Sequence, residues 1–169
     1  MSQFNPPSNT LVRRAVTDEA PIIARVLYQA FVEFEAQYTP AAFAATTPAS
    51  AEIRERWREG PVWVAAQGDQ LVGTISAVPK SERLYIRSMA VLSSQRGHGI
   101  GHLLLQAVEQ FAIAQGFQCM FLSTTPFLAG AIGLYEQFGF QQTDDAPHEL
   151  FGTSLFSMVK RLEPADQGC

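Results

Sequence analysis

Apolar side chains recur along the chain with two different spacings, which predict helices and strands in turn. Helical spacing from Ala20 to Phe34 follows an Asp-Glu pair that suits the positive end of a helix, so we expect a first helix that ends near Glu35. Residues 36–49 are rich in Ala, Thr and Pro and predict a loop or a broken helix. Further helices are expected over 50–59, 100–114 and 129–138, the last two closed by Gly116 and Gly139.

Short apolar runs between these helices predict the strands. The resulting order is strand, two helical pieces, three strands, and then helix, strand, helix, strand, strand. It predicts an α/β protein with one domain over 11–162 and a central mixed, mostly antiparallel sheet of six to seven strands flanked by about four helices. Residues 1–10 are expected to be a flexible lead-in and 163–169 a tail. The expected strands cover 11–16, 61–66, 70–78, 83–92, 117–123, 140–143 and 154–160.

Composition narrows the class of protein. The 169 residues are 47% hydrophobic and 17% charged, which is typical of one globular domain. A net charge of −4 does not favour nucleic-acid binding, which needs a positive field. The first ten residues lack the basic and apolar regions of a signal peptide, and the uncharged stretch 110–135 is interrupted by polar residues and glycines. We therefore expect a cytoplasmic protein without nucleic-acid or membrane partners.

The strongest chemical signal is a glycine-rich loop, Gln-Arg-Gly-His-Gly-Ile-Gly at 95–101, between a predicted strand and a predicted helix. Alternate glycines leave backbone N–H groups uncovered, a helix start adds unpaired donors, and Arg96 adds a cation, so we expect a site for a pyrophosphate or similar dianion. The P-loop pattern is absent, and the GxGxG spacing with no acid between Glu109 and Glu136 disfavours a dinucleotide site. The alternative interpretation of this segment is a glycine-rich turn that only begins a helix and binds no anion.

The segment Val-Leu-Ser-Ser-Gln-Arg-Gly-His-Gly-Ile-Gly at 91–101 resembles the acetyl-CoA signature of the GNAT superfamily of N-acetyltransferases. The core of that signature, Arg/Gln-x-x-Gly-x-Gly/Ala, is matched by Arg96, Gly99 and Gly101. Downstream, Leu-Tyr-Glu-Gln-Phe-Gly-Phe at 134–140 resembles the LYExxGF segment of the family. The resemblance covers about 11–161. It implies a GNAT-type fold, acetyl-CoA as cosubstrate, and direct acetyl transfer to a primary amine in a ternary complex. No metal is expected, because the sequence has no CxxC motif or His-rich cluster.

The resemblance also implies roles for particular residues. The strand end Met89, Ala90 and Val91 would pair with the pantetheine arm, and Arg96, Gly97, His98, Gly99, Ile100 and Gly101 would hold the pyrophosphate. Tyr135 would be the general acid that protonates the departing CoA thiolate. One position departs from the family pattern, because Leu128 stands where the family often has Asn. The alternatives are that Thr124, assigned to the cofactor site, or Thr125 takes over that polar role, or that the role is lost.

The acceptor side is less determined by the sequence. An ammonium ion must lose a proton before it can attack, yet the predicted fourth strand carries no carboxylate. Glu35 and Glu82 are the first candidates for the base, with Glu33, the pair His148 and Glu149, or a water relay as alternatives. The acceptor wall is expected to comprise Phe34, Tyr38, Tyr85 and Arg87, together with the loop 144–151.

Arg87 suggests an acceptor with a carboxylate, although a solvated strand residue is the alternative. We therefore predict a small-molecule or amino-acid-like amine as acceptor, and a homodimer by resemblance alone. A non-catalytic acyl-CoA-binding or regulatory module on the same fold is the alternative function. A nucleotide-phosphate enzyme is disfavoured, because neither competing loop pattern is met.

Overall fold

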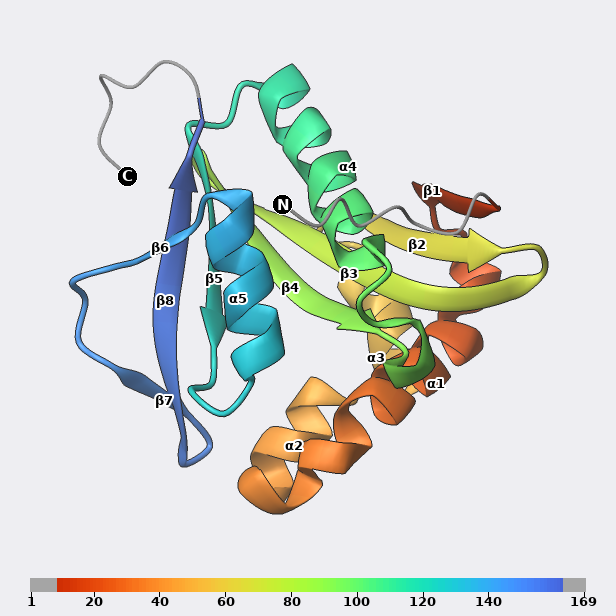
Figure 1. Cartoon of the computed structure of the whole chain (residues 1–169), viewed down its shortest axis with the longest axis horizontal. Helices are drawn as coiled ribbons and strands as arrows, with labels where there is room; N and C mark the ends of the chain where they lie inside the picture. Colours follow the sequence, from red (N-terminus) through yellow and green to blue (C-terminus); the bar gives the residue numbers. More distant parts are fainter. Residues whose placement is uncertain (1–8, 163–169) are drawn as a thin grey trace.

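The computed structural model describes residues 9–162, which fold around one large sheet (Figure 1). The strand order is β1-β2-β3-β4-β5-β8-β6, with β7 paired to β8, and only β4 and β5 run parallel. The strands are β1 (Thr10–Arg14), β2 (Val62–Gln67), β3 (Gln70–Lys80), β4 (Arg83–Val91), β5 (Cys119–Thr124), β6 (Gln141–Gln142), β7 (His148–Leu150) and β8 (Thr153–Arg161). The helices are α1 (Ala20–Phe31), α2 (Pro40–Thr46), α3 (Ser50–Arg56), α4 (Ile100–Gln115) and α5 (Ala129–Phe138).

This architecture confirms the predicted α/β class with a mixed, mostly antiparallel sheet. The described residues form eight strands and five α-helices, slightly more than the sequence predicted. The predicted lead-in and tail lie outside the described residues, except that Thr10 already belongs to β1. No helix in the described range 9–162 is long and apolar enough to cross a bilayer.

The helices form a layer on each side of the sheet (Figure 1), with α4 and α5 on one face and α1 and α3 on the other. A Cβ at Gly73 would meet Leu104 of α4, so this side of β3 faces α4. Residues two apart on one strand, and residues paired across two strands, share a face of the sheet. By this rule Ala77 of β3, its partner Ile86 of β4 and the fully buried Met120 of β5 lie on the same face as Gly73. The large apolar core lies on both faces of the sheet, against α4 on this side and against the buried face of α1 on the other.

The segment after α1 differs from the prediction in two ways. The helix ends at Phe31 rather than near Glu35, and a 3-10 helix continues over Val32–Gln37. Within 36–49, where a loop or broken helix was expected, α2 forms because Thr39 caps it and Pro40 occupies the first turn. The Thr39 hydroxyl oxygen accepts a hydrogen bond from the amide of Ala42 at 3.2 Å. The Thr-Pro pair was the local signal for this helix.

The expected loop 144–151 contains a further strand, β7, which forms a hairpin with β8. The turn residues Phe151 and Gly152 have φ values of 46° and 88°, so both lie in the left-handed region that a tight hairpin requires. Phenylalanine rarely adopts this conformation, and the sequence therefore did not predict the turn. The backbone carbonyl of Phe151 accepts a hydrogen bond from the Thr39 hydroxyl at 2.7 Å, which ties the hairpin to the start of α2.

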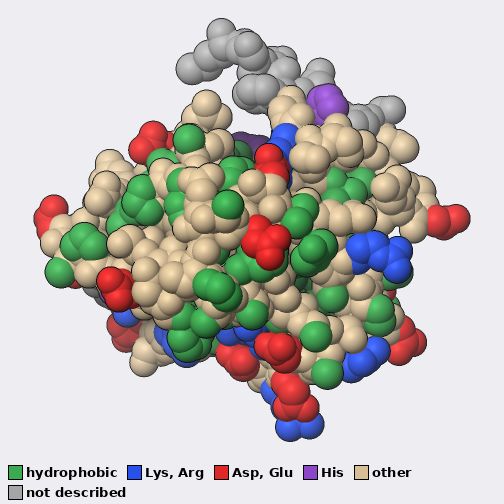
Figure 2. All heavy atoms as spheres, turned by 90° about the horizontal axis from the view of Figure 1, so that it is seen from below, with side chains coloured by type: hydrophobic (Ala, Val, Ile, Leu, Met, Phe, Trp, Pro, Cys, Tyr) green, Lys and Arg blue, Asp and Glu red, His purple; other side chains and the backbone are tan. Residues whose placement is uncertain are grey.

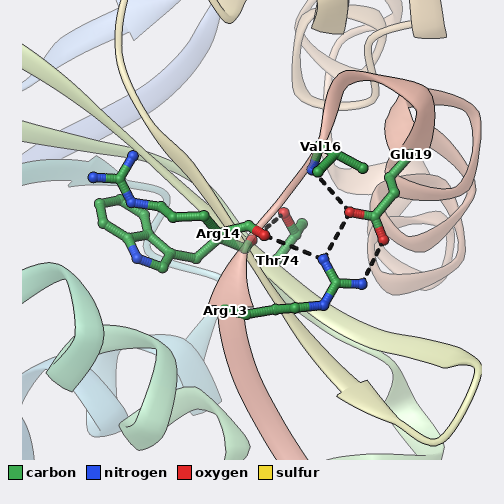
Figure 3. Close-up of polar contacts among 6 residues, drawn as sticks. Arg13, Arg14, Val16, Glu19 and Thr74 are labelled. Carbon is green, nitrogen blue, oxygen red and sulfur yellow. Dashed lines mark hydrogen bonds and ion pairs between the residues drawn. The ribbon is translucent and has the colours of Figure 1, made fainter.

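An ion pair secures the junction between β1 and α1 (Figure 3). Arg13 donates two hydrogen bonds to the carboxylate of Glu19, at 2.9 and 2.8 Å. The same carboxylate accepts a hydrogen bond from the amide of Val16 at 2.9 Å. The guanidinium beside Glu19 holds the pKa of this carboxyl below its usual range. Glu19 thus closes the 3-10 turn Thr17–Glu19 through its bond to Val16 and fixes the entry of the chain into α1.

Candidate functional site

The parallel strands β4 and β5 separate partway along their length (Figure 1). They pair only from Arg83 to Tyr85 on β4, with partners from Cys119 to Phe121 on β5. Among the described residues, the β5-facing edge of 86–91 therefore has no strand partner. Met89, Ala90 and Val91 lie on this edge, where an extended ligand can pair with the free backbone groups.

A β-bulge lies in the separated part of β4. The register shifts between the pairs Ser76–Arg87 and Thr74–Ala90, so β4 contains one extra residue there. Ser88 has a φ of 56°, which is strained for a residue with a side chain. Bulges bend a strand and redirect the backbone groups that follow. This bend accompanies the departure of β4 from β5.

The glycine-rich loop follows β4 and leads into α4. Gly97 and Gly99 have φ values of 81° and 80°, which is why glycine suits both positions. Within the described part of the chain, the amides from Gly97 to His102 donate to no protein acceptor. A Cβ at Gly101 would lie 2.5 Å from Cδ2 of Leu134, so this glycine lets α4 approach α5. The free amides and the positive end of α4 form a cradle that can hold an anion.

Arg96 has a different environment from the one expected. Its guanidinium forms an ion pair with Glu33 and donates to the carbonyl of Ala30 at 2.8 Å. It also donates to the carbonyl of Val91 at 3.3 Å. These bonds fasten the loop to the end of α1, and the backbone amides remain the groups that are free to bind an anion.

Tyr135 of α5 is buried, with 8% of its surface exposed. Burial raises the pKa of its phenol strongly, and nearby Tyr38 and Tyr85 raise it further. The phenol therefore stays protonated near neutral pH, as a proton donor must. Since Tyr38 and Tyr85 both act on Tyr135, three phenols from different elements converge beside the separated strands.

Aromatic residues form one wall of this region. Tyr38 packs edge-on against Phe127 with ring centres 4.9 Å apart, and Phe34 lies 6.3 Å from the same ring. Burial raises the pKa of Tyr38, while the hydroxyls of Thr125 and Thr46 oppose that rise. The buried Thr125 hydroxyl nevertheless meets no partner at full hydrogen-bond geometry. Phe127 was not among the site residues predicted from the sequence, although an aromatic residue just before a predicted helix could have indicated it.

Arg87 lies at the α3 side of the site. Its guanidinium pairs with Glu59 at 3.1 Å, while its Nε is buried without a hydrogen-bond partner. Burial lowers the pKa of Arg56 on α3, and the charge of Arg87 lowers it further. Burial raises the pKa of Tyr85 on the same face of β4. A ligand with a negative group would relieve the repulsion between the two arginines.

The remaining predicted residues lie at the margins of the site. Glu35 is exposed in the 3-10 helix, and Glu82 is exposed in the turn between β3 and β4. Neither carboxylate influences the pKa of the three converging phenols. Thr124 is buried at the end of β5, on the opposite face from Phe121. Leu128 is the N-cap residue of α5 and provides no side-chain hydrogen bond to the helix start, while its carbonyl accepts from the amide of Ile132.

Comparison with protein families gives one match that covers most of the chain. The family model described as "Acetyltransferase (GNAT) family" matches residues 27–140. N-acetyltransferase 8B from Rattus norvegicus is 41% identical over 103 residues, which cover 57% of this chain and 45% of that protein. N-acetyltransferase 8B from Homo sapiens is 34% identical over 106 residues, covering 59% and 43%. The matched segment is thus less than half of the length of these relatives.

Solved structures share the fold over nearly the whole described range. A ribosomal-protein-alanine N-acetyltransferase from Brucella melitensis is 26% identical, with a TM-score of 0.71 over 90% of this chain and 99% of that one. A PaiA N-acetyltransferase from Thermoplasma acidophilum, solved in complex with coenzyme A, has a TM-score of 0.77 at 15% identity and the same two coverages. At 15% identity, the similarity to the PaiA structure shows a shared fold and nothing more.

Proposed function

The chain belongs to the acetyltransferase (GNAT) family, and from this premise we propose that it transfers the acetyl group of acetyl-CoA to a primary amine of a small or amino-acid-like acceptor. The observation that carries the proposal is the unpaired edge of β4, which runs from the glycine-rich loop towards the phenol of Tyr135. No other part of the described chain combines an anion cradle, a free strand edge and a protonated acid.

The residues present fit acetyl-CoA. The pyrophosphate would accept hydrogen bonds from the amides between Gly97 and His102, and the dipole of α4 would favour its charge. The pantetheine arm would lie along Met89 to Val91 as an added strand. Arg96 holds the loop in position through Glu33 and Ala30, and its charge is already paired.

In the proposed reaction the neutral amine attacks the carbonyl carbon of the thioester. A carbon–nitrogen bond forms, the carbon–sulfur bond breaks, and the thiolate leaves. Tyr135 donates its phenolic proton to that thiolate and recovers a proton from the newly bound nitrogen. The raised pKa of Tyr135 supports this role, because it keeps the proton on the phenol until a strong acceptor forms beside it.

The surroundings favour a small acceptor with both apolar and polar parts. Phe34, Tyr38 and Phe127 supply an aromatic wall, and Arg87 supplies a cation with a buried unpaired Nε. Seen from below, the surface carries acidic and basic side chains among hydrophobic ones, without a large patch of one sign (Figure 2). A carboxylate on the acceptor would suit Arg87, which makes an amino-acid-like amine our first choice.

Calorimetry with acetyl-CoA, followed by thiol release across a panel of amines, amino acids and peptides, tests the proposal. We expect binding of acetyl-CoA and thiol release that depends on one class of amine. Binding without release from any acceptor would favour a non-catalytic acyl-CoA-binding module. If acetyl-CoA does not bind, the central proposal is wrong and the loop needs another ligand.

A further inference from the structure

An exposed imidazole from the β7–β8 hairpin contacts a serine of β5, the strand that separates from β4 at the site. The Nε2 atom of His148 lies 3.1 Å from the Oγ atom of Ser123. His148 belongs to β7 and Ser123 to β5, and β8 lies between these strands. The side chain of His148 therefore crosses over β8 to reach β5.

Strand pairing puts both residues on the face that carries Tyr85. Ser123 pairs with Ser157 and His148 pairs with Leu155, and these two partners are two residues apart on β8, so they share a face. Phe121 precedes Ser123 by two residues and pairs with Tyr85 of β4. The hydroxyl of Ser123 and the phenol-bearing side chain of Tyr85 thus project from the same side of the sheet.

Along the chain, Ser123 lies between Phe121 and Thr125, and each of these residues interacts with one of the converging tyrosines. Two residues before it, the ring of Phe121 packs on Tyr85 with centres 5.2 Å apart. Two residues after it, the hydroxyl of Thr125 faces the phenol of Tyr38. An extended strand advances about 3.3 Å per residue, so Ser123 follows Phe121 on the same face of β5 at a spacing of about 7 Å. Both tyrosines are close enough to act on Tyr135.

The surroundings do not use His148 as a charge partner. The segment β5 has no charged residue, and β8 carries charge only at its last two residues, Lys160 and Arg161. On β7 itself Glu149 alternates to the other face. The titratable or charged groups that face the same side from β4 are Tyr85, Arg87 and Arg83, of which Arg83 lies over the ring of Phe121.

We propose that His148 is the base of the acetyl transfer and takes the proton of the acceptor ammonium through the hydroxyl of Ser123. The proposal rests on the acetyl transfer proposed above. The ammonium donates one proton to Ser123 Oγ as the hydroxyl proton moves to Nε2 of His148, which leaves a neutral amine. After attack, the second proton reaches the CoA thiolate through Tyr135. The exposed imidazolium returns its proton to water, so each turnover releases one proton.

A pair of acceptors with one carbon skeleton tests this role. The alkylamine that releases most thiol in the panel is compared with the hydrazide of the same skeleton, which is already neutral at pH 7. We expect His148→Gln to lower kcat/KM for the alkylamine about 100-fold. The hydrazide needs no base before attack, so its kcat/KM should change less than about 3-fold. Ser123→Ala should show the same selectivity with a smaller loss, about 10-fold.

The control is Ser154→Ala, an exposed substitution on β8 that lies on the other face of the β7–β8 hairpin and should leave both acceptors unchanged. The pH profile adds a second readout, because the His148→Gln defect should shrink as pH rises towards the pKa of the alkylamine. Equal losses with both acceptors, or no loss with the alkylamine, would overturn this role for His148 while leaving acetyl transfer intact. Absence of thiol release by the unaltered chain with every amine would overturn both proposals.

Discussion

On the α4 side of the β4–β5 pair, Leu84, Ile86 and Met120 are almost completely buried, whereas Tyr85 and Phe121 on the opposite side retain exposed surface. The same two strands therefore present apolar side chains to the core and polar or aromatic ones to the site. Strand alternation makes this possible, since neighbouring residues project to opposite faces. Substitutions on one face should change stability, and substitutions on the other should change chemistry.

The largest expected effect concerns the phenol that reaches the site. Tyr135→Phe removes the proposed general acid but keeps the buried ring, so we expect kcat to fall about 10²- to 10⁴-fold. Acetyl-CoA affinity, measured by calorimetry, should stay within about 3-fold of the unaltered value. Tyr28→Phe, at a tyrosine that is 50% exposed on α1, is the matched control and should leave kcat unchanged. Equal kcat in both variants would exclude Tyr135 as the acid.

The core side of β5 should respond in the opposite way. Leu122→Ala creates a cavity beneath the helices, because Leu122 is 2% exposed, and it should lower the free energy of unfolding by about 2–5 kcal/mol. Leu11→Ala, at a leucine that is 60% exposed, should change that free energy by less than about 0.5 kcal/mol. Chemical denaturation measures both values. Similar losses in the two variants would contradict the assignment of Leu122 to the core.

Alanine substitutions at two glycines distinguish an effect of backbone strain on stability from an effect on ligand binding. Gly97 in the loop and Gly68 in the β2–β3 turn both have positive φ and open space where a Cβ would be. Alanine at either position should lower the free energy of unfolding by about 1–2 kcal/mol. Only Gly97→Ala should weaken acetyl-CoA binding, by about 10-fold, because its Cβ would stand before the amide cradle. An equal loss of affinity in Gly68→Ala would show that the effect is strain alone.

Alkaline pH should weaken the fold through the converging phenols. Burial raises the pKa of Tyr135, Tyr38 and Tyr85 above the ordinary value of about 10. Below that value both folded and unfolded states are protonated, and the full stability is present. Above it the unfolded state loses protons first, so the free energy of unfolding should fall. Denaturation between pH 8 and pH 11 measures the decline, which should be shallower in Tyr135→Phe.

The smallest expected effects concern two ion pairs near α1, Arg13–Glu19 and Arg96–Glu33. Glu19→Gln weakens the hydrogen bonds that Glu19 accepts from Arg13 and from the amide of Val16, and it should lower the free energy of unfolding by about 1 kcal/mol without changing acetyl-CoA affinity. Glu33→Gln affects an exposed pair with Arg96, so its effect on stability should stay below about 1 kcal/mol. It should instead weaken acetyl-CoA binding a few-fold by loosening the loop. Identical profiles for the two variants would contradict this division.

Local signals sufficed for much of the fold and for part of the site. Apolar spacing predicted α4, α5 and the central strands to within a few residues, because their burial follows directly from that pattern. The glycine-rich loop was evident for a similar reason, since free amides at a helix start need only local sequence. Phe151 was not recognised as a turn residue, because its positive φ is imposed by the hairpin around it.

Contacts between distant segments could not be predicted from the sequence. Arg96 pairs with Glu33, which precedes it by 63 residues, and no local pattern indicates that contact. The separation of β4 from β5 depends on how far their pairing extends, which is set by the packing of the whole sheet. His148 was one of several possible bases, and only the strand order brings it to Ser123.

The most direct test of acetyl transfer follows free CoA thiol and acetylated amine together in one reaction with the unaltered chain. We predict that thiol release requires the amine and that one acetylated amine, detected by mass spectrometry, forms for each thiol released. Tyr135→Phe should bind acetyl-CoA and form both products at least 100-fold more slowly. Binding of acetyl-CoA with no amine-dependent thiol release from any member of the panel would contradict the account.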